Sequence, residues 1–577
     1  MKTRLKIRMN FLKINLKPIL FFSCYACILI FSRIGDFNLF DWDEINFAES
    51  SREMLLSNNF SQVMINFEPF HEKPPLFFWI QTISFKIFGT TSFAARFPNA
   101  LLSIIIPIIL FKIGTRLKNT TFGWIWSIIF IAGFLPNLYF RSGIIDPYFN
   151  LFIFLSINFF FSYIRIKHIK HIFLSSFFAG LAILCKGPVG LLIVLLSCST
   201  YLLLYKIKFP FKHVLFFFVT VILVSSPWYF FELLNKGPWF LFEFLQYQIE
   251  LFSHPVAGHK QPIYYHFLVV LFGCIPFSFF AFRNSFVDSG SGIAFEKMMR
   301  IVLWVILILF TIVSTKIVHY SSMAYLPLSF LASIEIYKLY MGKSFHWVLK
   351  YSLSFTGFLI GLILMVAFYV LIHQKEFLIN SINDFYIQKL LNIELNWIGW
   401  EWIIPSLFIL GSIIWLTIFE SKVLLSLVSY SLIIGLFFSL LSKFTIPKIE
   451  NITQGSVISF YKKISKEKKY LTTVGYKSYA HYFYSEFKPL KSTDFLYIKK
   501  NEILRNRFNK SSLNDLNRKE KTTFNSYVLS WLINGELDRA AYFVAKNNKA
   551  IEQLEKAKNL KVVQDYGGYK IYKRELK

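Results

Sequence analysis

Acidic side chains are scarce in this chain: its 577 residues include 33 aspartates and glutamates against 62 lysines and arginines. Charged residues of both signs make up only 16% of the sequence, whereas soluble globular domains carry about 25%. Hydrophobic residues reach 55% and aromatic residues 19%, and the mean hydropathy is +0.49. This balance excludes an ordinary soluble domain and is typical of a polytopic membrane protein.

Cysteine is also rare, and its positions exclude a disulfide-bonded scaffold. The five cysteines all lie in apolar stretches: Cys24, Cys27, Cys185, Cys198 and Cys274. Because Cys24 and Cys27 fall inside one apolar run, we expect neither a redox nor a zinc site there. Glycine gives no nucleotide-binding fingerprint, since Gly475 and Gly567-Gly568 lack the G-x-G-x-x-G context.

The formal net charge of +29 raises the question of a nucleic-acid partner. The basic residues, however, lie in short blocks between apolar runs, where such residues set membrane topology and contact lipid headgroups. We therefore predict a lipid bilayer, and no nucleic acid, as the partner of these charges.

Apolar runs that favour membrane-spanning helices recur along the chain. The first covers residues 18–34, and the others lie near 97–113, 121–139, 148–164, 171–185, 188–205, 213–231, 267–283, 301–315, 321–337, 350–371, 399–419 and 422–443. About 13 spans are predicted. Residues 1–17 carry six basic residues and no acid, and no small-x-small cleavage site follows. We expect an uncleaved first span with a cytoplasmic N-terminus.

With that orientation, the turns predicted on the inner side are basic, as the positive-inside rule requires. They contain Lys112, Arg116, Lys118, Arg165, Lys167, Lys170, Lys206, Lys208, Lys212, Lys297, Arg300, Lys338 and Lys343. The prediction is a multi-pass protein of a bacterial inner membrane, in which the loop formed by residues 35–96 faces the periplasm.

The composition changes abruptly after Leu441, and residues 446–577 are rich in Lys, Asn and Glu. Short apolar runs alternate there with helical patterns such as 546–557; the runs are 470–474, 495–498, 540–545 and 562–572. This alternation predicts a small α/β domain on the periplasmic side. The expected division is a membrane domain, 1–445, that includes loop 35–96, and a C-terminal domain, 446–577.

Loop 35–96 gathers acids, prolines and aromatic residues, and charges at a membrane surface point to function. A helical pattern begins near Asp41, which suits the N-cap, while Glu44 three residues later can complete a capping box. Asp43 has no such structural explanation and is our first candidate for chemistry. On this helix we expect an apolar face formed by Ile45, Ala48 and Leu55. We expect a more exposed polar face formed by Glu49, Arg52 and Glu53.

The second half of the loop contains Glu72-Lys73-Pro74-Pro75. The two prolines restrict the backbone before them and place Glu72 and Lys73 at the start of a helix over 76–88. At 1.5 Å per residue this helix covers about 20 Å, too short to span a bilayer. It is expected at the membrane surface, held by Phe77, Phe78 and Trp79. A lysine that snorkels to headgroups is the alternative for Lys73.

Cations are scarce in the other outer turns, so each one that is present suggests a function. Arg141 precedes Asp146, Lys186 lies in a Cys-Lys-Gly-Pro turn, and Lys316 precedes His319-Tyr320. Each residue alone could be a boundary residue that snorkels. All these turns return to the face that carries Lys73, which favours one shared anion-binding site.

The loop motifs resemble a known family. Asp43-Glu44, Ser51-Arg52-Glu53-Met54-Leu55, Glu72-Lys73-Pro74-Pro75-Leu76 and Ala95-Arg96-Phe97-Pro98 are similar to the first extracytoplasmic loop of polyprenyl-phosphate-sugar-dependent glycosyltransferases. The bacterial aminoarabinose lipid A transferases and the protein O-mannosyltransferases are the subfamilies concerned. The resemblance is specific over 41–100 and thins to isolated motifs up to Pro327. In the family, Asp-Glu-x-Arg-Tyr stands where this chain has Asp43-Glu44-Ile45-Asn46-Phe47.

The resemblance implies a polytopic helical membrane protein of the GT-C type that uses a polyprenyl-phosphate-linked sugar, hexosyl or pentosyl, with inversion at the anomeric carbon. The implied acceptor is lipid A or a protein. In the aminoarabinose transferases a histidine can join the loop glutamate around a divalent metal, and by position Glu72 and His259 form that pair. Two ligands do not make a metal site. A histidine that hydrogen-bonds or contacts headgroups is the alternative, so no cofactor is assigned with certainty.

Transfer of the sugar expels a lipid phosphate, whose developing charge requires fixed cations. The candidates are Lys73, Arg141, Lys186 and Lys316. A hydroxyl acceptor also needs a carboxylate base, for which Asp43 and Asp146 are available; Glu44, His319 and Tyr320 are expected to line the site. A lipid or saccharide transporter is the rival function, although it should carry ionisable residues near mid-span. A non-catalytic assembly subunit is a second rival, which leaves the acid and Lys-Pro-Pro motifs unexplained.

Overall fold

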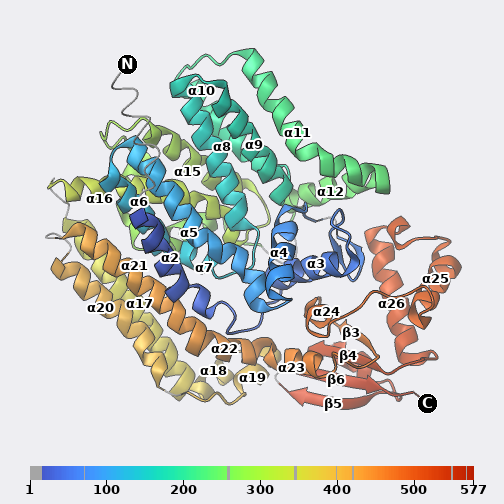
Figure 1. Cartoon of the computed structure of the whole chain (residues 1–577). Helices are drawn as coiled ribbons and strands as arrows, with labels where there is room; N and C mark the ends of the chain where they lie inside the picture. Colours follow the sequence, from blue (N-terminus) through green and yellow to red (C-terminus); the bar gives the residue numbers. More distant parts are fainter. Residues whose placement is uncertain are drawn as a thin grey trace. The chain divides into compact units, whose positions relative to one another are not determined.

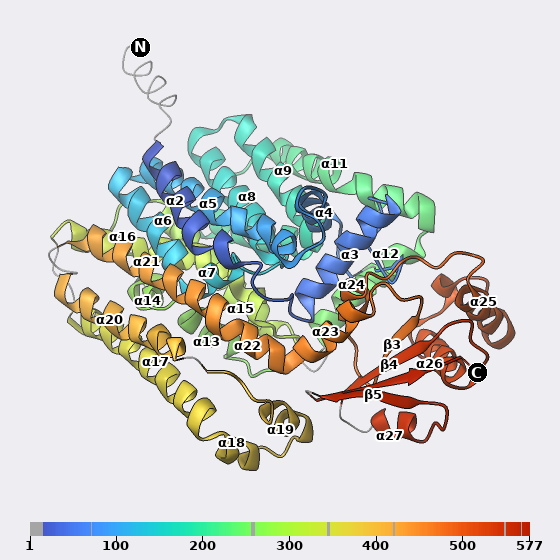
Figure 2. The same ribbon diagram turned by 60° about the horizontal axis from the view of Figure 1, so that its bottom comes forward.

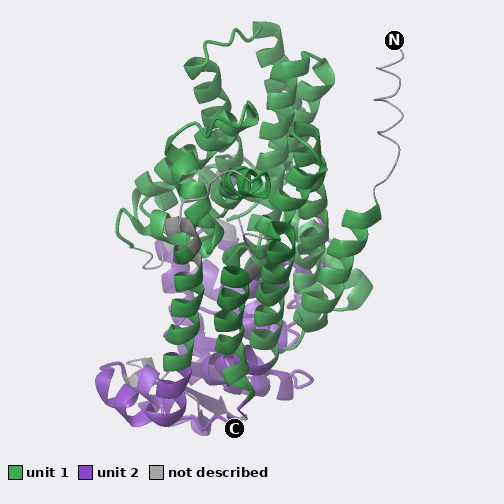
Figure 3. Cartoon of the chain, turned by 90° about the vertical axis from the view of Figure 1, so that its left-hand side faces the viewer, with its two compact units in different colours: residues 1–36, 71–366, 400–443 green, residues 37–70, 367–399, 444–577 purple. Residues whose placement is uncertain are grey.

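The computed structural model describes residues 16–70, 72–255, 260–342, 347–397, 399–418, 422–546, 550–566 and 568–576. The chain forms two compact units, shown in Figure 3. Unit 1 contains residues 1–36, 71–366 and 400–443, and unit 2 contains residues 37–70, 367–399 and 444–577. Segments 37–70 and 367–399 thus group with the C-terminal residues. The division of the sequence at 445/446 stays a prediction.

Unit 1 is helical (Figure 1). Its helices are α2 (Leu16–Leu29), α4 (Leu76–Phe88), α5 (Ser92–Leu117), α6 (Thr120–Ala132), α7 (Phe134–Tyr139), α8 (Asp146–Ile166), α9 (Ile169–Lys186), α10 (Val189–Leu204), α11 (Phe211–Lys236), α12 (Trp239–Ser253), α13 (Tyr265–Gly273), α14 (Phe277–Phe286), α15 (Phe295–Ile312), α16 (Tyr325–Tyr340), α20 (Ile403–Ile418) and α21 (Val423–Leu440). Helix α17 (Trp347–His373) continues from unit 1 into unit 2. Every predicted apolar run falls on one or more of these helices.

The chain is a multi-pass membrane protein, but the predicted count of about 13 spans is not fully confirmed. Within the described residues, seven helices are long and apolar enough to cross a membrane, or eight if the bent pair 357–373 and 375–381 is one span. Two predicted runs are broken by backbone features. Run 121–139 divides at Gly133, and run 267–283 divides at Cys274-Ile275-Pro276.

Helix α4 covers the predicted residues, 76–88, and follows Pro74-Pro75 directly. Phe77 and Phe78 are fully buried inside the protein, so they anchor the helix through protein contacts. Gln81 and Ser84 donate hydrogen bonds to backbone carbonyls at the start of α5, of 2.9 and 2.6 Å. The opposite face of α4 leaves apolar side chains exposed, as a helix at a membrane surface requires.

Unit 2 contains a four-stranded sheet, which Figure 2 shows from a second side. The strands are β3 (Tyr470–Val474), β4 (Ala541–Lys546), β5 (Lys561–Tyr566) and β6 (Tyr569–Arg574), in the order β3-β4-β6-β5. Strand β3 runs parallel to β4, and the other neighbours are antiparallel. The predicted small α/β domain is therefore confirmed.

Helices α25 (Phe495–Phe508), α26 (Arg518–Asn534) and α27 (Ala550–Glu555) pack on one face of this sheet, because their buried residues share a core with alternate residues of β4. The expectation from the apolar run 495–498 was wrong: these residues open α25 instead of a strand. The other elements of unit 2 are α3 (Asp43–Ser57), β1 (Met64–Ile65), β2 (Glu68–Pro69), α18 (Lys375–Ser381), α19 (Phe385–Leu391), α22 (Ile446–Glu450), α23 (Ser456–Lys463) and α24 (Ala480–Tyr484).

The start of α3 differs from the predicted capping box. The helix begins at Asp43, and its N-cap is Trp42, whose side chain makes no capping hydrogen bond. Asp41 lies one residue too early to serve as the cap. Glu44 nevertheless binds backbone ahead of the helix, because its Oε2 accepts a 3.0 Å hydrogen bond from the N–H of Phe40. Glu44 thus has a structural role, although its partner is not the predicted one.

Candidate functional site

The centre of the candidate site in unit 1 is an ion pair between two helix ends. Asp146 is the first residue of α8 and Lys186 is the last residue of α9. Lys186 Nζ lies 2.5 Å from Asp146 Oδ1, and Asp146 is only 3% exposed. Gly187, at φ +92°, ends α9 in a conformation that favours glycine. The Lys-Gly-Pro sequence therefore fixes where the ammonium group lies.

His319 and Tyr320 complete this cluster. They lie in the 3-10 helix Val318–Ala324. His319 Nε2 is 4.0 Å from Asp146 Oδ2. The ammonium of Lys186 lies over two rings, 5.1 Å from the centroid of Tyr320 and 5.6 Å from that of Phe149. Cation–π contacts of this kind add to the ion pair in holding the ammonium group in place.

Lys73, which directly precedes Pro74-Pro75, lies in the same region. Its Nζ lies 5.4 Å from the centroid of Tyr247, on α12. The Tyr247 hydroxyl donates a 3.1 Å hydrogen bond to Glu72 Oε2, so one tyrosine positions both neighbouring residues. Lys73 also contributes to the electrostatic field at Asp146, together with Lys186 and His319. The structure thus brings Lys73, Lys186, Asp146 and His319 together.

A cavity of about 360 Å³ is lined by the two lysines of this cluster and by Tyr320. Its polar lining includes Lys73 and Lys186, while most of its wall is apolar. The lining residues are Lys73, Phe149, Lys186, Pro188, Val189, Leu192, Gln248, Leu251, Phe252, Leu309, Phe310, Val313 and Tyr320. We call this space the lysine cavity. Two ammonium groups beside an apolar wall fit a ligand with an anionic group and a hydrocarbon part.

The other two predicted phosphate contacts have different partners. Arg141 is buried; it donates hydrogen bonds to Asn137 Oδ1 at 3.3 Å and to the carbonyl of Gly435 at 3.2 Å. Lys316 donates to the carbonyls of Thr311 and Val313, at 3.0 and 2.7 Å. Neither residue lines the lysine cavity. Their predicted role as phosphate contacts stays a prediction.

Asp43 and Glu44 belong to unit 2, where Asp43 is half-buried as the first residue of α3 and Glu44 is buried. Further along α3, the expectation of an exposed polar face was wrong. Glu49 and Glu53 are fully buried and Arg52 is 4% exposed. Arg52 binds Glu49 through two hydrogen bonds of 2.7 and 2.6 Å and also donates to the carbonyl of Phe487.

Glu53 explains this burial. Its two carboxylate oxygens accept hydrogen bonds from the N–H groups of Asn66 and Phe67, at 2.6 and 2.7 Å. Both donors have positive φ, in the turn between β1 and β2. Burial, and then the adjacent Glu49, raise the pKa of Glu53 to about 9. Sequence periodicity missed this network because it cannot show what covers a helix face, although the Ser51-Arg52-Glu53 motif marked the place.

The predicted metal pair cannot be placed, because His259 lies outside the described residues. Glu72 accepts the hydrogen bond from Tyr247 described above. Within the described part of the chain, no group of three His, Cys, Asp or Glu side chains is close enough to hold a metal ion. Sequence reasoning also missed Tyr247 and Phe149, since aromatic residues are frequent throughout the chain and carry no distinctive spacing.

Sequence comparison adds independent information. Residues 72–230 match the family described as dolichyl-phosphate-mannose-protein mannosyltransferase. An undecaprenyl phosphate-alpha-4-amino-4-deoxy-L-arabinose arabinosyl transferase of Wigglesworthia glossinidia brevipalpis is 26% identical over 378 residues, 64% of this chain and 66% of that protein. A transferase of the same name from Proteus mirabilis is 28% identical over 244 residues, 41% of this chain and 43% of that protein. The chain thus spans just under two thirds of the length of the first relative and less than half of the length of the second.

Two solved structures have a similar fold over nearly the whole chain. ArnT from Cupriavidus metallidurans, in a crystal structure bound to undecaprenyl phosphate, gives a TM-score of 0.76 at 15% identity and covers 97% of this chain and 98% of that one. The same protein in the apo state gives 0.74 at 16% identity, covering 96% and 97%. The predicted GT-C-like helical membrane fold with a small C-terminal α/β domain is therefore confirmed.

Proposed function

We propose that this chain is a glycosyltransferase, because its fold and loop motifs are similar to those of the aminoarabinose transferases. It moves a sugar from a polyprenyl-phosphate donor to an acceptor such as lipid A. The relatives named above are arabinosyl transferases that use undecaprenyl phosphate carriers, and one structure with this fold holds undecaprenyl phosphate. The sugar transferred by this chain is a hexose or a pentose.

The lysine cavity is the observation that carries this proposal. A polyprenyl-phosphate sugar has a hydrocarbon chain, an anionic phosphate and a sugar in sequence, and the cavity offers an apolar wall next to two ammonium groups. Lys73 and Lys186 would bind the phosphate, while the side chains of α10, α12 and α15 would contact the first prenyl units. A transporter would also bind such a lipid, so the reaction itself must be tested.

The chemistry follows from the charges. In the transfer step the acceptor oxygen forms a bond to the anomeric carbon, and the bond from that carbon to the phosphate oxygen breaks. The leaving phosphate keeps the electron pair and gains one negative charge, which Lys186 and Lys73 stabilise. Both oxygens of Asp146 face cationic or polar partners, Lys186 at 2.5 Å and His319 at 4.0 Å. We therefore assign Asp146 to hold Lys186 in place.

The proton of a hydroxyl acceptor needs a separate base, and Asp43 is our candidate. A phosphate acceptor on lipid A is already nucleophilic, in which case Asp43 orients it. Arg141 and Lys316 are proposed as further contacts to the donor phosphate, and Glu44, His319 and Tyr320 as lining residues. A divalent ion held by Glu72 and His259 would add charge stabilisation at the phosphate.

We place the protein in a bacterial inner membrane, with the site and the C-terminal domain in the periplasm. The basic inner turns support this orientation. A protein O-mannosyltransferase is the second candidate function, favoured by the family match over residues 72–230.

The experiment compares strains with and without the gene by mass spectrometry of lipid A and of envelope glycoproteins. A sugar that disappears from lipid A supports the first function, and one that disappears from glycoproteins supports the second. No change in either fraction would contradict both. Purified protein in lipid vesicles, supplied with a polyprenyl-phosphate sugar, then separates transfer from transport, because only transfer releases free polyprenyl phosphate.

A further inference from the structure

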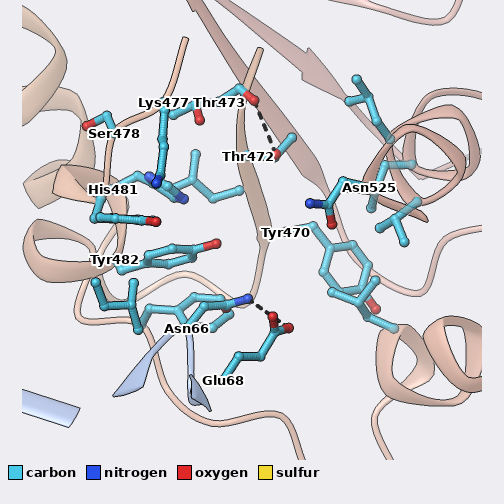
Figure 4. Close-up of a pocket in the computed structure, with 18 of the residues that line it drawn as sticks. Asn66, Glu68, Tyr470, Thr472, Thr473, Lys477, Ser478, His481, Tyr482 and Asn525 are labelled. Carbon is cyan, nitrogen blue, oxygen red and sulfur yellow. Dashed lines mark hydrogen bonds between the residues drawn. The ribbon is translucent and has the colours of Figure 1, made fainter. Parts of the chain in front are cut away.

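Unit 2 contains a second, larger cavity of about 600 Å³, which Figure 4 shows. Its walls come from four parts of the unit: residues 65–70 around the β1–β2 turn, residues 470–482 from β3 to α24, residues 487–500 through the start of α25, and residues 525–532 of α26. The volume falls in the range of sites for small organic ligands, about 300–1,000 Å³. We call this space the tyrosine cavity, because Tyr470, Tyr476, Tyr479 and Tyr482 all line it.

Polar groups of the tyrosine cavity are mostly neutral. In Figure 4, Tyr482 extends into the cavity from one side and Asn525 from the opposite side, so that a hydroxyl and an amide face the same space. Tyr482 is itself stacked on Tyr479, with ring centroids 6.2 Å apart and planes at 20°. Hydroxyls and amides both donate and accept hydrogen bonds. The rings supply flat apolar surface between them.

Backbone groups add to this lining. Strand β3 is an edge strand, since β4 is its only neighbour in the four-stranded sheet. The N–H of Tyr470 donates to the carbonyl of Ala540, on the β4 side. Backbone groups of a strand alternate in direction, so those of Leu471 and Thr473 point away from β4. Both residues line the cavity. The carbonyl of Thr473 accepts a 3.5 Å hydrogen bond from the Thr472 hydroxyl, and the N–H groups of both residues are placed to bind a ligand.

The charged residues of the tyrosine cavity are paired with one another or lie on aromatic rings. Lys500 Nζ lies 3.3 Å from Glu68 Oε1, and Asn66 also donates to that oxygen at 3.3 Å. The ammonium of Lys477 lies over the rings of Trp42 and Tyr479 at 5.4 and 5.3 Å. Burial lowers the pKa of His481 to about 3, so its ring is neutral at physiological pH. Lys477 and Lys500 therefore have partners within this cavity, and the other polar groups of its lining include hydroxyls, amides and backbone groups.

We propose that the tyrosine cavity binds a neutral oligosaccharide. Sugars expose hydroxyls that donate and accept hydrogen bonds on an apolar C–H framework, and this wall offers amides, hydroxyls, edge backbone groups and stacked rings. The volume accommodates a short oligosaccharide. The assignment of that oligosaccharide as the carbohydrate part of the acceptor rests on the proposed function; the binding of sugar does not.

A peptide is the competing occupant, because edge strands can bind extended peptides by strand addition. The five residues of β3 argue against it: only Leu471 and Thr473 direct their backbone groups away from β4, and two positions make a very short ladder. The shape of the wall favours a ligand with hydrogen-bonding groups on all sides.

The test uses the full-length protein in lipid nanodiscs and measures the binding of chitotriose and maltotriose by calorimetry and saturation-transfer NMR. Tyr482→Phe and Asn525→Ala each remove one hydrogen-bonding group and should weaken binding about threefold to tenfold. Asn525 is exposed on α26, so its removal leaves the fold intact. Tyr527→Phe is the matched control, because Tyr527 lies on the same helix but does not line the cavity.

Lys186→Met separates this inference from the proposed function. It removes a donor contact in unit 1, and the oligosaccharide affinity should equal that of the wild type. The proposal is overturned if neither oligosaccharide binds at millimolar concentration, or if Tyr482→Phe and Asn525→Ala bind like the Tyr527→Phe control. It is also overturned if a peptide rich in serine and threonine binds in the same assay and loses affinity in these variants while the oligosaccharides do not.

Discussion

Both units of this protein bury charged side chains, but the surroundings of these charges differ. In unit 1, Lys186 and Asp146 form a pair at the wall of the lysine cavity. In unit 2, Glu49, Arg52 and Glu53 make short hydrogen bonds to one another and to backbone groups. The difference teaches that burial of a charge is not by itself a sign of catalysis. A charge that borders a cavity can act on a ligand, whereas one whose bonds are all made within the protein supports the fold.

Asp43 gives the strongest test of this difference between the units, because it is a carboxylate of unit 2 to which we nevertheless assign chemistry. The substitution Asp43→Asn keeps the size of the side chain but removes the charge of the proposed base. The transfer rate should therefore fall about 10²–10⁴-fold. Turnover and donor affinity would both be measured in reconstituted protein, and the donor affinity should be unchanged. Glu44→Gln is the matched control, because glutamine retains an oxygen that can accept from the N–H of Phe40, and should lose under about 1 kcal/mol of stability. An inactive Glu44→Gln beside an active Asp43→Asn would reverse the two roles.

Lys186→Met tests the charge at the cavity wall. Loss of the ammonium should slow transfer about 10²–10³-fold, since the leaving phosphate loses one fixed cation. It also leaves Asp146 without its closest partner, which should lower stability. Adding Asp146→Asn should restore the thermal midpoint but not the activity. Lys86→Met, an exposed residue in the last turn of α4, is the control. Recovery of activity in the double variant would show that the pair is purely structural.

Glu53→Ala tests the structural network of unit 2. Removing the carboxylate leaves the N–H groups of Asn66 and Phe67 without their acceptor, and each unsatisfied buried group costs about 1–3 kcal/mol. We expect unit 2 to lose about 2–4 kcal/mol, measured by denaturation of the full chain in detergent. Glu53→Gln keeps one of the two acceptor oxygens and should therefore lose less than Glu53→Ala. Equal loss in both variants would mean that the hydrogen bond to the retained oxygen does not stabilise the turn.

The pH dependence of stability tests the same residue, and its effect is smaller when it is counted per pH unit. Burial and Glu49 raise the pKa of Glu53 to about 9, so the folded state keeps a proton that the unfolded chain has already lost. The stability of unit 2 should therefore fall as the pH rises from the ordinary range of a glutamate towards 9, by at most about 1.4 kcal/mol per pH unit. In Glu53→Gln this part of the slope should vanish. An identical pH profile in wild type and variant would contradict the assignment.

The sequence predicted the elements whose ends are encoded locally. Pro74-Pro75 and Gly89 delimit α4, and the run 470–474 became β3 without a shift. The Lys-Gly-Pro and His-Tyr turns meet in the structure, while the alternation of about 13 spans that placed them on one face stays a prediction. Local signals were sufficient for α4 and β3.

Features that depend on distant partners could not be predicted. Arg141 donates to the carbonyl of Gly435, 294 positions away, and nothing near Arg141 in the sequence indicates that contact. The polar face of α3 is buried because a turn at residues 66 and 67 presents two N–H groups to Glu53. A helical pattern shows which residues share a face, but the packing partner decides whether that face is exposed.

A measurement of donor binding is the most direct test of the lysine cavity as the donor site. Wild-type protein, Lys73→Ala and Lys186→Met, each in nanodiscs, would be titrated with a short-chain polyprenyl phosphate, with the matching polyprenyl alcohol as the phosphate-free control. Each variant should weaken phosphate binding about 30-fold or more, because a charge-assisted contact of about 2 kcal/mol or more is lost, while binding of the alcohol should stay unchanged. Wild-type affinity for the phosphate in both variants would contradict the assignment of the lysine cavity as the donor site.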